Sequence, residues 1–159
     1  MPENFELINQ VKALSGFSPE LEDCLKEIAP IIVPHLPKVT DAFYVRLLVI
    51  RSTSVFLENH VEKLDDLKKI HLNWLISLFE ARIDAEFAER MRKVGETHVN
   101  IKLPMEFMAG SMGLLNKELI KVVMNEIQDK DTCLKALQAI NAVTSLTLII
   151  MQKSYQLWD

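Results

Sequence analysis

The chain is 159 residues long, with 49% hydrophobic residues, 25% charged residues and a formal net charge of −4. A chain of this length can bury about 70% of its unfolded surface, so we expect residues 1–159 to form a single domain. The slightly acidic balance gives no basic patch for a nucleic acid or a membrane surface. Cys24 and Cys133 form no motif and are typical of a reducing, cytoplasmic compartment.

The placement of proline favours an all-α fold. Five of the six prolines precede residue 38, and the remaining chain is interrupted only by Pro104, which leaves long stretches free for helices. Apolar residues at helical spacing predict helices over 4–14 and 19–28, the second with Ser18 as its N-cap. A kinked passage with three prolines follows, and then a helix to about residue 50.

The second half of the chain predicts four more helices. The pattern loosens over 51–57, which predicts a corner or a short extra turn. Helical periodicity then covers 61–82, 85–101, 104–128 and a last segment from about 131 to about 157. Asp84 is the expected N-cap of the second of these helices, and Asp131 or Thr132 is the expected N-cap of the last.

The last helix contains the most hydrophobic stretch of the chain. Polar residues interrupt this stretch, which falls short of the roughly 18 continuous apolar residues typical of a transmembrane helix, so we expect no membrane span. Apolar residues lie on two of its sides, with Leu137, Ile140 and Leu148 on one and Val143, Leu146 and Ile150 on the other. One side is expected to face the core and the other a second subunit, which predicts a homodimer.

Two histidines lie on apolar helical stripes. His98 continues the spacing of Phe87, Met91 and Val94 at steps of four, three and four residues. His71 lies in the same way on the stripe of the 61–82 helix. A buried polar group without a partner costs roughly 1–3 kcal/mol, so each ring requires a partner such as a backbone carbonyl or a metal.

The residues alone leave two interpretations of these histidines open. A single histidine of this kind is most often satisfied inside a protein core. Two of them on helices joined by a short turn can instead bracket a flat cofactor with iron between them. Zinc is disfavoured because no Cys, Asp or Glu accompanies them on either stripe, whereas haem needs only one or two axial nitrogens and an apolar slot. His35 and His60 are expected at the surface or at a helix cap.

Three stretches together resemble the sensor globin domain of bacterial globin-coupled sensors: Trp74 to Phe79, then Asp84, then Val94-Gly95-Glu96-Thr97-His98-Val99-Asn100-Ile101-Lys102-Leu103-Pro104. In that family a Trp-containing helix precedes a helix ending in an Ile-Gly-x-x-His-like element, and a Gly-Leu/Ile-Pro-like turn opens the next helix. Asp41 to Leu48 is similar to the family's distal-tyrosine helix. The resemblance covers nearly the whole chain and implies a globin-like fold with an extra N-terminal helix.

By position, the resemblance implies that His98 is the proximal haem ligand. It implies that Tyr44 is the distal tyrosine that hydrogen-bonds a bound diatomic gas, with Leu67 and Ile70 at apolar distal positions. Four more residues on these stripes are expected to serve as core side chains and to contact the haem: Phe43, Trp74, Val94 and Met108.

Two residues depart from the family pattern. His71 replaces a residue that is usually apolar, which implies either a sixth iron ligand or a hydrogen bond inside the pocket or to a haem propionate. Lys102 stands where the family usually has Gly, which requires the turn to keep φ negative and the lysine side chain to point outward.

These features predict a sensor that holds a b-type haem and detects O2, another diatomic gas such as CO or NO, or a change of redox state. The signal is expected to pass by helix shifts through a homodimer of the last two helices, and the family couples such domains to a downstream transmitter domain. The alternative is a globin-like interaction module without haem. The sequence contains no grouping of residues that indicates an enzyme.

Overall fold

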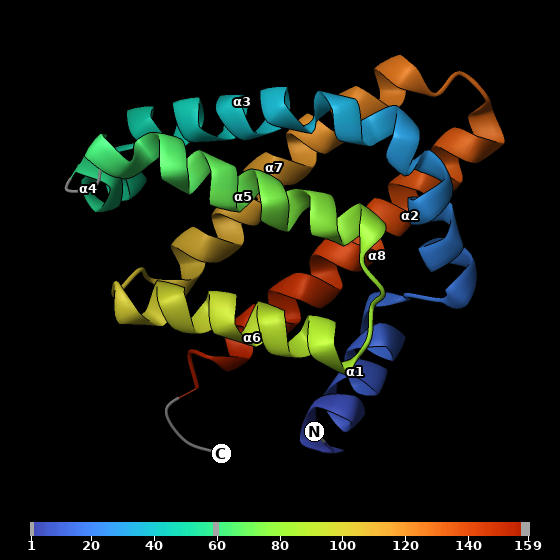
Figure 1. Cartoon of the computed structure of the whole chain (residues 1–159), viewed down its shortest axis with the longest axis horizontal. Coiled ribbons are helices and arrows are strands. Elements are labelled where there is room, and N and C mark those ends of the chain that lie inside the picture. Colours follow the sequence, from blue (N-terminus) through green and yellow to red (C-terminus); the bar gives the residue numbers. More distant parts are fainter. Residues whose placement is uncertain (1, 59–60, 157–159) are drawn as a thin grey trace.

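The computed structural model describes residues 2–58 and 61–156, and within them every regular element is helical (Figure 1). The elements in chain order are α1 (Pro2–Ser15), α2 (Pro19–Ile32), the 3₁₀ turn η1 (Val33–His35), α3 (Leu36–Val49), α4 (Arg51–Glu58), the 3₁₀ turn η2 (Val61–Lys63), α5 (Leu64–Glu80), α6 (Ala85–Asn100), α7 (Met105–Glu126) and α8 (Lys130–Lys153). The all-α prediction is confirmed.

Two of the predicted N-caps are present. The Ser18 side chain accepts a hydrogen bond from the Leu21 amide at the start of α2, where Pro19 occupies the first helical position. The carboxylate of Asp84 accepts one from the Phe87 amide at the start of α6. Both side chains satisfy an amide that has no partner within its own helix.

The predicted end of α2 and the predicted cap of α8 were wrong. The second helix continues through Pro30 to Ile32 because a proline removes only one backbone hydrogen bond at this point, while Ala29 and Ile32 are buried in the core. The N-cap of α8 is Asp129, whose carboxylate accepts hydrogen bonds from the amide and hydroxyl of Thr132. The predicted end of the last helix near residue 157 was also wrong, because α8 ends at Lys153 and the chain turns over residues 154–156.

A corner at Ile50 separates α3 from α4. Ile50 has an extended backbone (φ −88°, ψ 116°), and the Thr53 hydroxyl donates a hydrogen bond to the Leu47 carbonyl across the bend (2.7 Å). The chain then forms the eight-residue helix α4. The sequence therefore predicted the corner correctly, and it continues as two helical turns rather than as a single short one.

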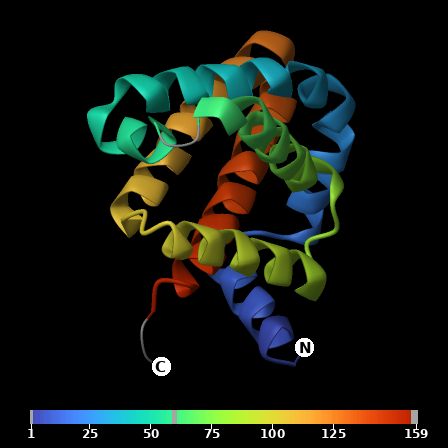
Figure 2. The ribbon, with the colours of Figure 1, turned by 60° about the vertical axis from the view of Figure 1, so that its left-hand side comes forward.

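Helix α8 is the central element of the core. It packs against α1, α2, α6 and α7, and Figure 2 shows it crossing the middle of the molecule. Ile140, Val143, Leu146 and Ile150, which come from both predicted apolar sides, are buried within this chain. The side expected to meet a second subunit is therefore largely covered by the chain's own helices, because α8 is surrounded rather than packed on one face.

The central position of α8 in the core also explains why this long helix is so apolar. By length and composition, α8 is the one helix in the described residues that is apolar enough to cross a membrane, but 56% of its most apolar window is buried inside the protein. This burial is typical of a core helix.

Candidate functional site

Four aromatic rings from α3 and α5 form what we call the aromatic cluster: Phe43, Tyr44, His71 and Trp74. The His71 ring stacks on Phe43 with 4.6 Å between ring centroids and 12° between planes. Tyr44 meets the edge of His71 at 5.6 Å, and Trp74 lies at 5.4 Å from it with a tilted ring. Aromatic rings thus contact His71 on three sides. The cluster brings together residues that lie up to 31 positions apart in the chain.

A buried hydroxyl on α3 provides the hydrogen bond that His71 requires. Thr40 Oγ1 lies 3.0 Å from His71 Nδ1, and Thr40 is only 2% exposed. Burial lowers the pKa of His71 to about 4, so the ring is neutral at pH 7 and carries one N–H and one lone pair. Its Nε2 has no hydrogen-bond partner among the described residues.

Tyr44 supplies a second polar group to the aromatic cluster. Its hydroxyl donates a long, weak hydrogen bond to the Leu67 carbonyl (3.4 Å). Burial raises the pKa of Tyr44 to about 12, so the hydroxyl keeps its proton at any physiological pH. The weak bond leaves this O–H free to turn toward a stronger acceptor.

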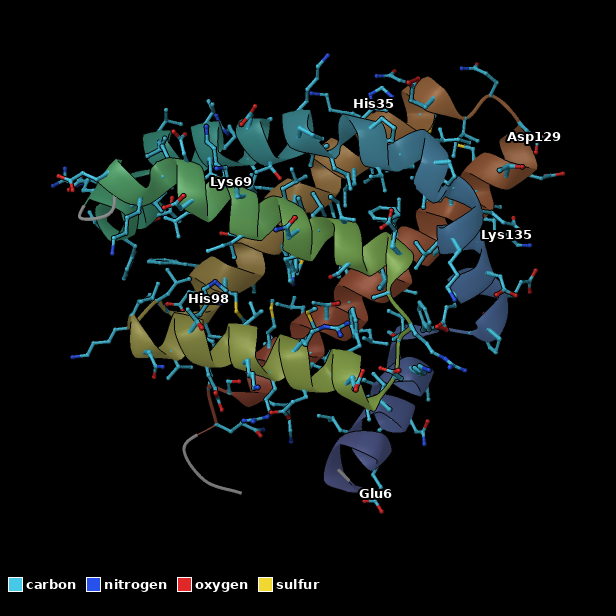
Figure 3. All side chains as sticks on the ribbon, viewed as in Figure 1. Glu6, His35, Lys69, His98, Asp129 and Lys135 are labelled. Carbon is cyan, nitrogen blue, oxygen red and sulfur yellow. The ribbon has the colours of Figure 1, made fainter. Side chains whose placement is uncertain are left out.

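His98 lies near the C-terminal end of α6, on the side of that helix that faces α5 (Figure 3). The earlier residues of its stripe, Phe87 and Met91, are buried, and Val94 is half-buried. Burial lowers the pKa of His98, and the Val94 carbonyl one turn earlier offsets this only in part. The Nδ1 atom of His98 is sealed from solvent and has no partner at hydrogen-bonding geometry.

Helices α5 and α6 follow each other in the chain but pack on different neighbours. α5 packs on α2 and α3, whereas α6 packs on α1 and α8, and both ribbon views show the two helices apart along most of their length (Figures 1 and 2). One polar contact joins them, from Trp74 Nε1 to the sulfur of Met91 (3.1 Å). No hydrogen bond or ring contact in the described residues links His98 to the aromatic cluster.

The C-terminal half of α6 is pressed against the end of α8. A Cβ atom on Gly95 would lie 2.5 Å from the Met151 carbonyl oxygen and 2.7 Å from Ser154 Oγ, so only glycine fits at this crossing. The Ser154 hydroxyl donates to the Arg92 carbonyl (2.9 Å). The helix that carries His98 is therefore fixed to α8 one turn before His98.

The turn after His98 is closed by backbone hydrogen bonds. Leu103 N donates to the His98 carbonyl and Lys102 N to the Val99 carbonyl, the pair of bonds that ends a helix in a Schellman motif. Lys102 has φ 61°, so the expectation of a negative φ was wrong: the motif places this residue in the left-handed region whatever its side chain. The exposed Lys102 side chain does point outward, as expected. Tyr155 Oη donates to the Leu103 carbonyl (2.7 Å) and ties the end of the described chain to this turn.

The structure separates the predicted site residues into two groups. Phe43, Tyr44, His71 and Trp74 lie together, with Leu67 beside Tyr44, whereas Val94 and His98 lie one turn apart on α6. Met108 is buried in the core on α7. Of the other two histidines, His35 contacts the Glu126 carboxylate through Nε2, and His60 lies outside the described residues.

One predicted position does not belong to the site in this structure. Ile70 is 65% exposed, so it does not line the interior beside Leu67. The buried arc of α5 centres on Leu75, Leu78 and Phe79, and a residue five positions from Leu75 lies about 140° away around the helix.

Sequence reasoning missed Thr40 and Gly95. Thr40 precedes Tyr44 by one helical turn, so a search for polar residues on the stripe of Phe43 and Leu47 would have found it. Gly95 was recognised only as part of the Ile-Gly-x-x-His-like element, and its packing role was missed because it depends on which helix crosses α6 at that point.

The residues present fit a haem better than a metal ion held by protein ligands alone. The described residues contain no group of three or more His, Cys, Asp or Glu side chains that could hold a metal. They do offer two imidazoles, one on α5 and one on α6, and burial lowers the pKa of both rings, which keeps them in the neutral form that binds a metal. Haem iron requires only one or two such axial ligands and an apolar setting.

Comparison with known proteins places the chain in a family. The family model described as Protoglobin matches residues 5–157. The chain is similar to the globin domain of a globin-coupled sensor from Geobacter sulfurreducens, with 25% identity, a TM-score of 0.86, and coverage of 93% of this chain and 97% of that one. It also shares its fold with the globin domain of E. coli DosC in the ferric and ferrous forms, at 20% identity, a TM-score of 0.78, and coverage of 93% and 99%. This chain therefore belongs to the protoglobin family and has the fold of a sensor globin domain.

Proposed function

We propose that this protein is a haem-binding sensor globin in which a b-type haem lies between α5 and α6 and is held by His98. The observation that carries the proposal is the environment of His98: a largely buried imidazole on the side of α6 that faces α5, kept by its lowered pKa in the neutral form that binds a metal. When bound, the haem iron supplies the capacity to bind a diatomic gas or to change oxidation state.

His98 would hold the haem iron as its proximal ligand, through Nε2. A ligating histidine usually donates its other ring N–H to an acceptor that fixes its tautomer. The Val94 carbonyl, one turn earlier on the same helix, already acts on the His98 ring. A carbonyl only accepts hydrogen bonds, so a ligated His98 whose Nδ1 turned to this carbonyl would carry its proton on Nδ1 and its lone pair on Nε2.

Tyr44 is the donor that a bound gas would meet on the other side. Its weak bond to the Leu67 carbonyl and its retained proton support this role. One O–H donor in an apolar setting suits O2, which accepts hydrogen bonds strongly when bound, over CO or NO. The aromatic rings of Phe43 and Trp74, which pack around His71, would exclude water from the same space.

His71 has two roles in this proposal, and the buried position of its ring supports both. It either provides a sixth ligand through Nε2 or provides hydrogen bonding within the pocket. If His71 ligates, a gas must displace it, and the apparent gas affinity falls by the fraction of sites that are open. Redox sensing then becomes more favourable relative to simple O2 binding.

The contacts of α6 with α8 support the proposed relay. Any shift of His98 moves the helix that crosses Met151 at Gly95 and the turn that Tyr155 holds at Leu103. Exposed apolar residues on α7 and at the start of α8, Ile120, Met124 and Leu134, support a homodimer through the last two helices. The signal would pass from there to a downstream transmitter domain in the cytoplasm, without a chemical step in this chain.

Haem titration of the purified protein tests the proposal. We expect a Soret band that saturates at one haem per chain, and we expect His98→Ala to lose it. His35→Ala is the matched control, because His35 contacts Glu126 away from α6, and it should keep full haem uptake. No saturable uptake by the unmodified protein would contradict the proposal and favour a haem-free interaction module.

A further inference from the structure

The hydrogen bond between Thr40 and His71 has a property that the interaction between Val94 and His98 lacks. A carbonyl only accepts, but a threonine hydroxyl both donates and accepts and can rotate between the two. Thr40 Oγ1 lies 3.0 Å from His71 Nδ1, so a bond forms with the proton on either atom. Both neutral tautomers of His71 are therefore satisfied at Nδ1 without any movement of the ring.

The ring of His71 is also held in place. Phe43 stacks on it, with 12° between the planes, and Tyr44 and Trp74 contact it from two other directions. Nδ1 faces Thr40 on α3, and Nε2 lies on the opposite side of the imidazole with no hydrogen-bond partner in the described part of the chain. Unlike Nδ1 of His98, this Nε2 is not a sealed atom.

We propose that Thr40 is a positioning residue that allows His71 to alternate between two roles by turning its hydroxyl. With Nδ1–H donating to Thr40, Nε2 presents a lone pair and serves as a metal ligand. With the Thr40 O–H donating to Nδ1, Nε2 carries the proton and donates a hydrogen bond to a bound gas. This inference rests on the haem-binding function proposed above and assigns Thr40 a part in it.

The alternation involves no net chemistry. The neutral ring holds one proton in both states: solvent water supplies a proton to Nε2 and takes up the proton that leaves Nδ1, while the hydroxyl turns from acceptor to donor. The free energy between the two tautomers stays small because each has one hydrogen bond at Nδ1 of the same kind and length. A valine at position 40 has nearly the same shape as threonine but satisfies neither tautomer.

The first test uses the haem-free protein and reads the ¹⁵N chemical shifts of the His71 ring nitrogens. We expect Thr40→Val to shift the Nδ1 resonance. Thr40→Ser should leave that resonance near its position in the unmodified protein, because serine retains the hydroxyl. Thr144→Val is the matched control: this buried threonine on α8 donates to the Ile140 carbonyl within its own helix. An unchanged Nδ1 resonance in Thr40→Val would overturn the inference.

The second test uses the haem-loaded protein and compares Thr40→Val in the presence and absence of His71. We expect Thr40→Val to reduce the six-coordinate low-spin fraction about tenfold, the usual scale for losing the hydrogen-bond partner of a ligating histidine, and to speed O2 dissociation. In a His71→Leu background the same change should have no effect on either quantity. Equal effects in both backgrounds, or no effect of His71→Leu itself, would overturn the role assigned to Thr40.

The two tests separate failure of this inference from failure of the proposed function. If the unmodified protein takes up no haem, the sensor function fails, and the ring-nitrogen shifts still decide whether Thr40 and His71 are bonded. If haem binds through His98 but the spectra are independent of Thr40, only the role of Thr40 fails.

Discussion

His98 and His71 have the same sequence signature and opposite surroundings. Each lies on the apolar stripe of its helix, yet His98 has a sealed, unpartnered Nδ1, while His71 has a hydrogen bond to Thr40 and three aromatic neighbours. Their helices differ as well, since α6 is fixed to α8 at Gly95 and α5 packs on α2 and α3. Helical periodicity therefore predicts the side of the helix on which a residue lies, but not the partner that its side chain contacts.

Haem affinity should separate the two histidines most strongly. We expect His98→Ala to weaken haem binding at least about 100-fold, which corresponds to about 2.7 kcal/mol, because it removes the proximal ligand. His71→Ala should weaken it less than about tenfold and should instead change the spin state. Competition for haem with a second haem protein measures both affinities, and equal losses in the two variants would contradict different roles for the two histidines.

The pH dependence of folding is the next contrast. Burial lowers the pKa of His71 from 6.5 to about 4, so between these values the unfolded chain binds a proton that the folded protein does not. Stability of the haem-free protein is then fully present above pH 6.5 and falls as the pH drops toward 4, by at most about 3 kcal/mol. Urea titrations across this range should show a flatter profile for His71→Leu. An unchanged slope in that variant would contradict the buried, neutral state of the ring.

The attachment of α6 to α8 predicts the effect of a single methyl group. Gly95→Ala places a carbon 2.5 Å from the Met151 carbonyl oxygen and should destabilise the protein by about 2 kcal/mol, since overpacking outweighs the better helix propensity of alanine. Gly110→Ala on α7 is the matched control, because nothing lies within 4 Å of the added carbon. That variant should be neutral or stabilised by up to about 1 kcal/mol. Thermal unfolding measures both, and similar melting temperatures would show that α6 is free to move away from α8.

A substitution in the turn after His98 is expected to have the smallest effect on the free energy of unfolding. It should stabilise the protein, whereas Gly95→Ala should destabilise it. Lys102 adopts φ 61° at the Schellman position, where a side chain costs roughly 1 kcal/mol relative to glycine. Lys102→Gly should therefore stabilise the protein by up to about 1 kcal/mol, an effect reduced by the extra freedom of glycine in the unfolded chain. Lys102→Ala keeps the left-handed cost and should leave stability near that of the unmodified protein. Denaturant midpoints decide this, and a loss of stability in Lys102→Gly would indicate that the lysine side chain makes a favourable contact.

Local sequence rules were sufficient for much of the framework. The caps Ser18 and Asp84 were predicted because an N-cap bonds to an amide three residues later, which is a relation within one segment. The corner near residue 50 was predicted because the apolar pattern failed there. The orientation of His98 toward the interior followed from the spacing of its own stripe.

The site itself was predicted only in part. The aromatic cluster includes four of the predicted residues, but Ile70 lies outside because the buried arc of α5 depends on where α2 and α3 pack. Pro30 lies inside α2 because the burial of its neighbours stabilises the helix by more than the loss of one backbone hydrogen bond costs. In each case a contact between distant segments changed the outcome.

The sequence by itself determined that this chain forms helices, where several of them begin, and that two histidines face inward, because these properties depend on neighbours within a few turns. The tertiary structure alone decided that Thr40 bonds to His71, that the Nδ1 of His98 is left without a partner, and that α8 is covered on both apolar sides. The physical reason is that a hydrogen-bond partner or a packing surface from another helix is chosen by the crossing of helices, and no residue spacing within one helix records that crossing.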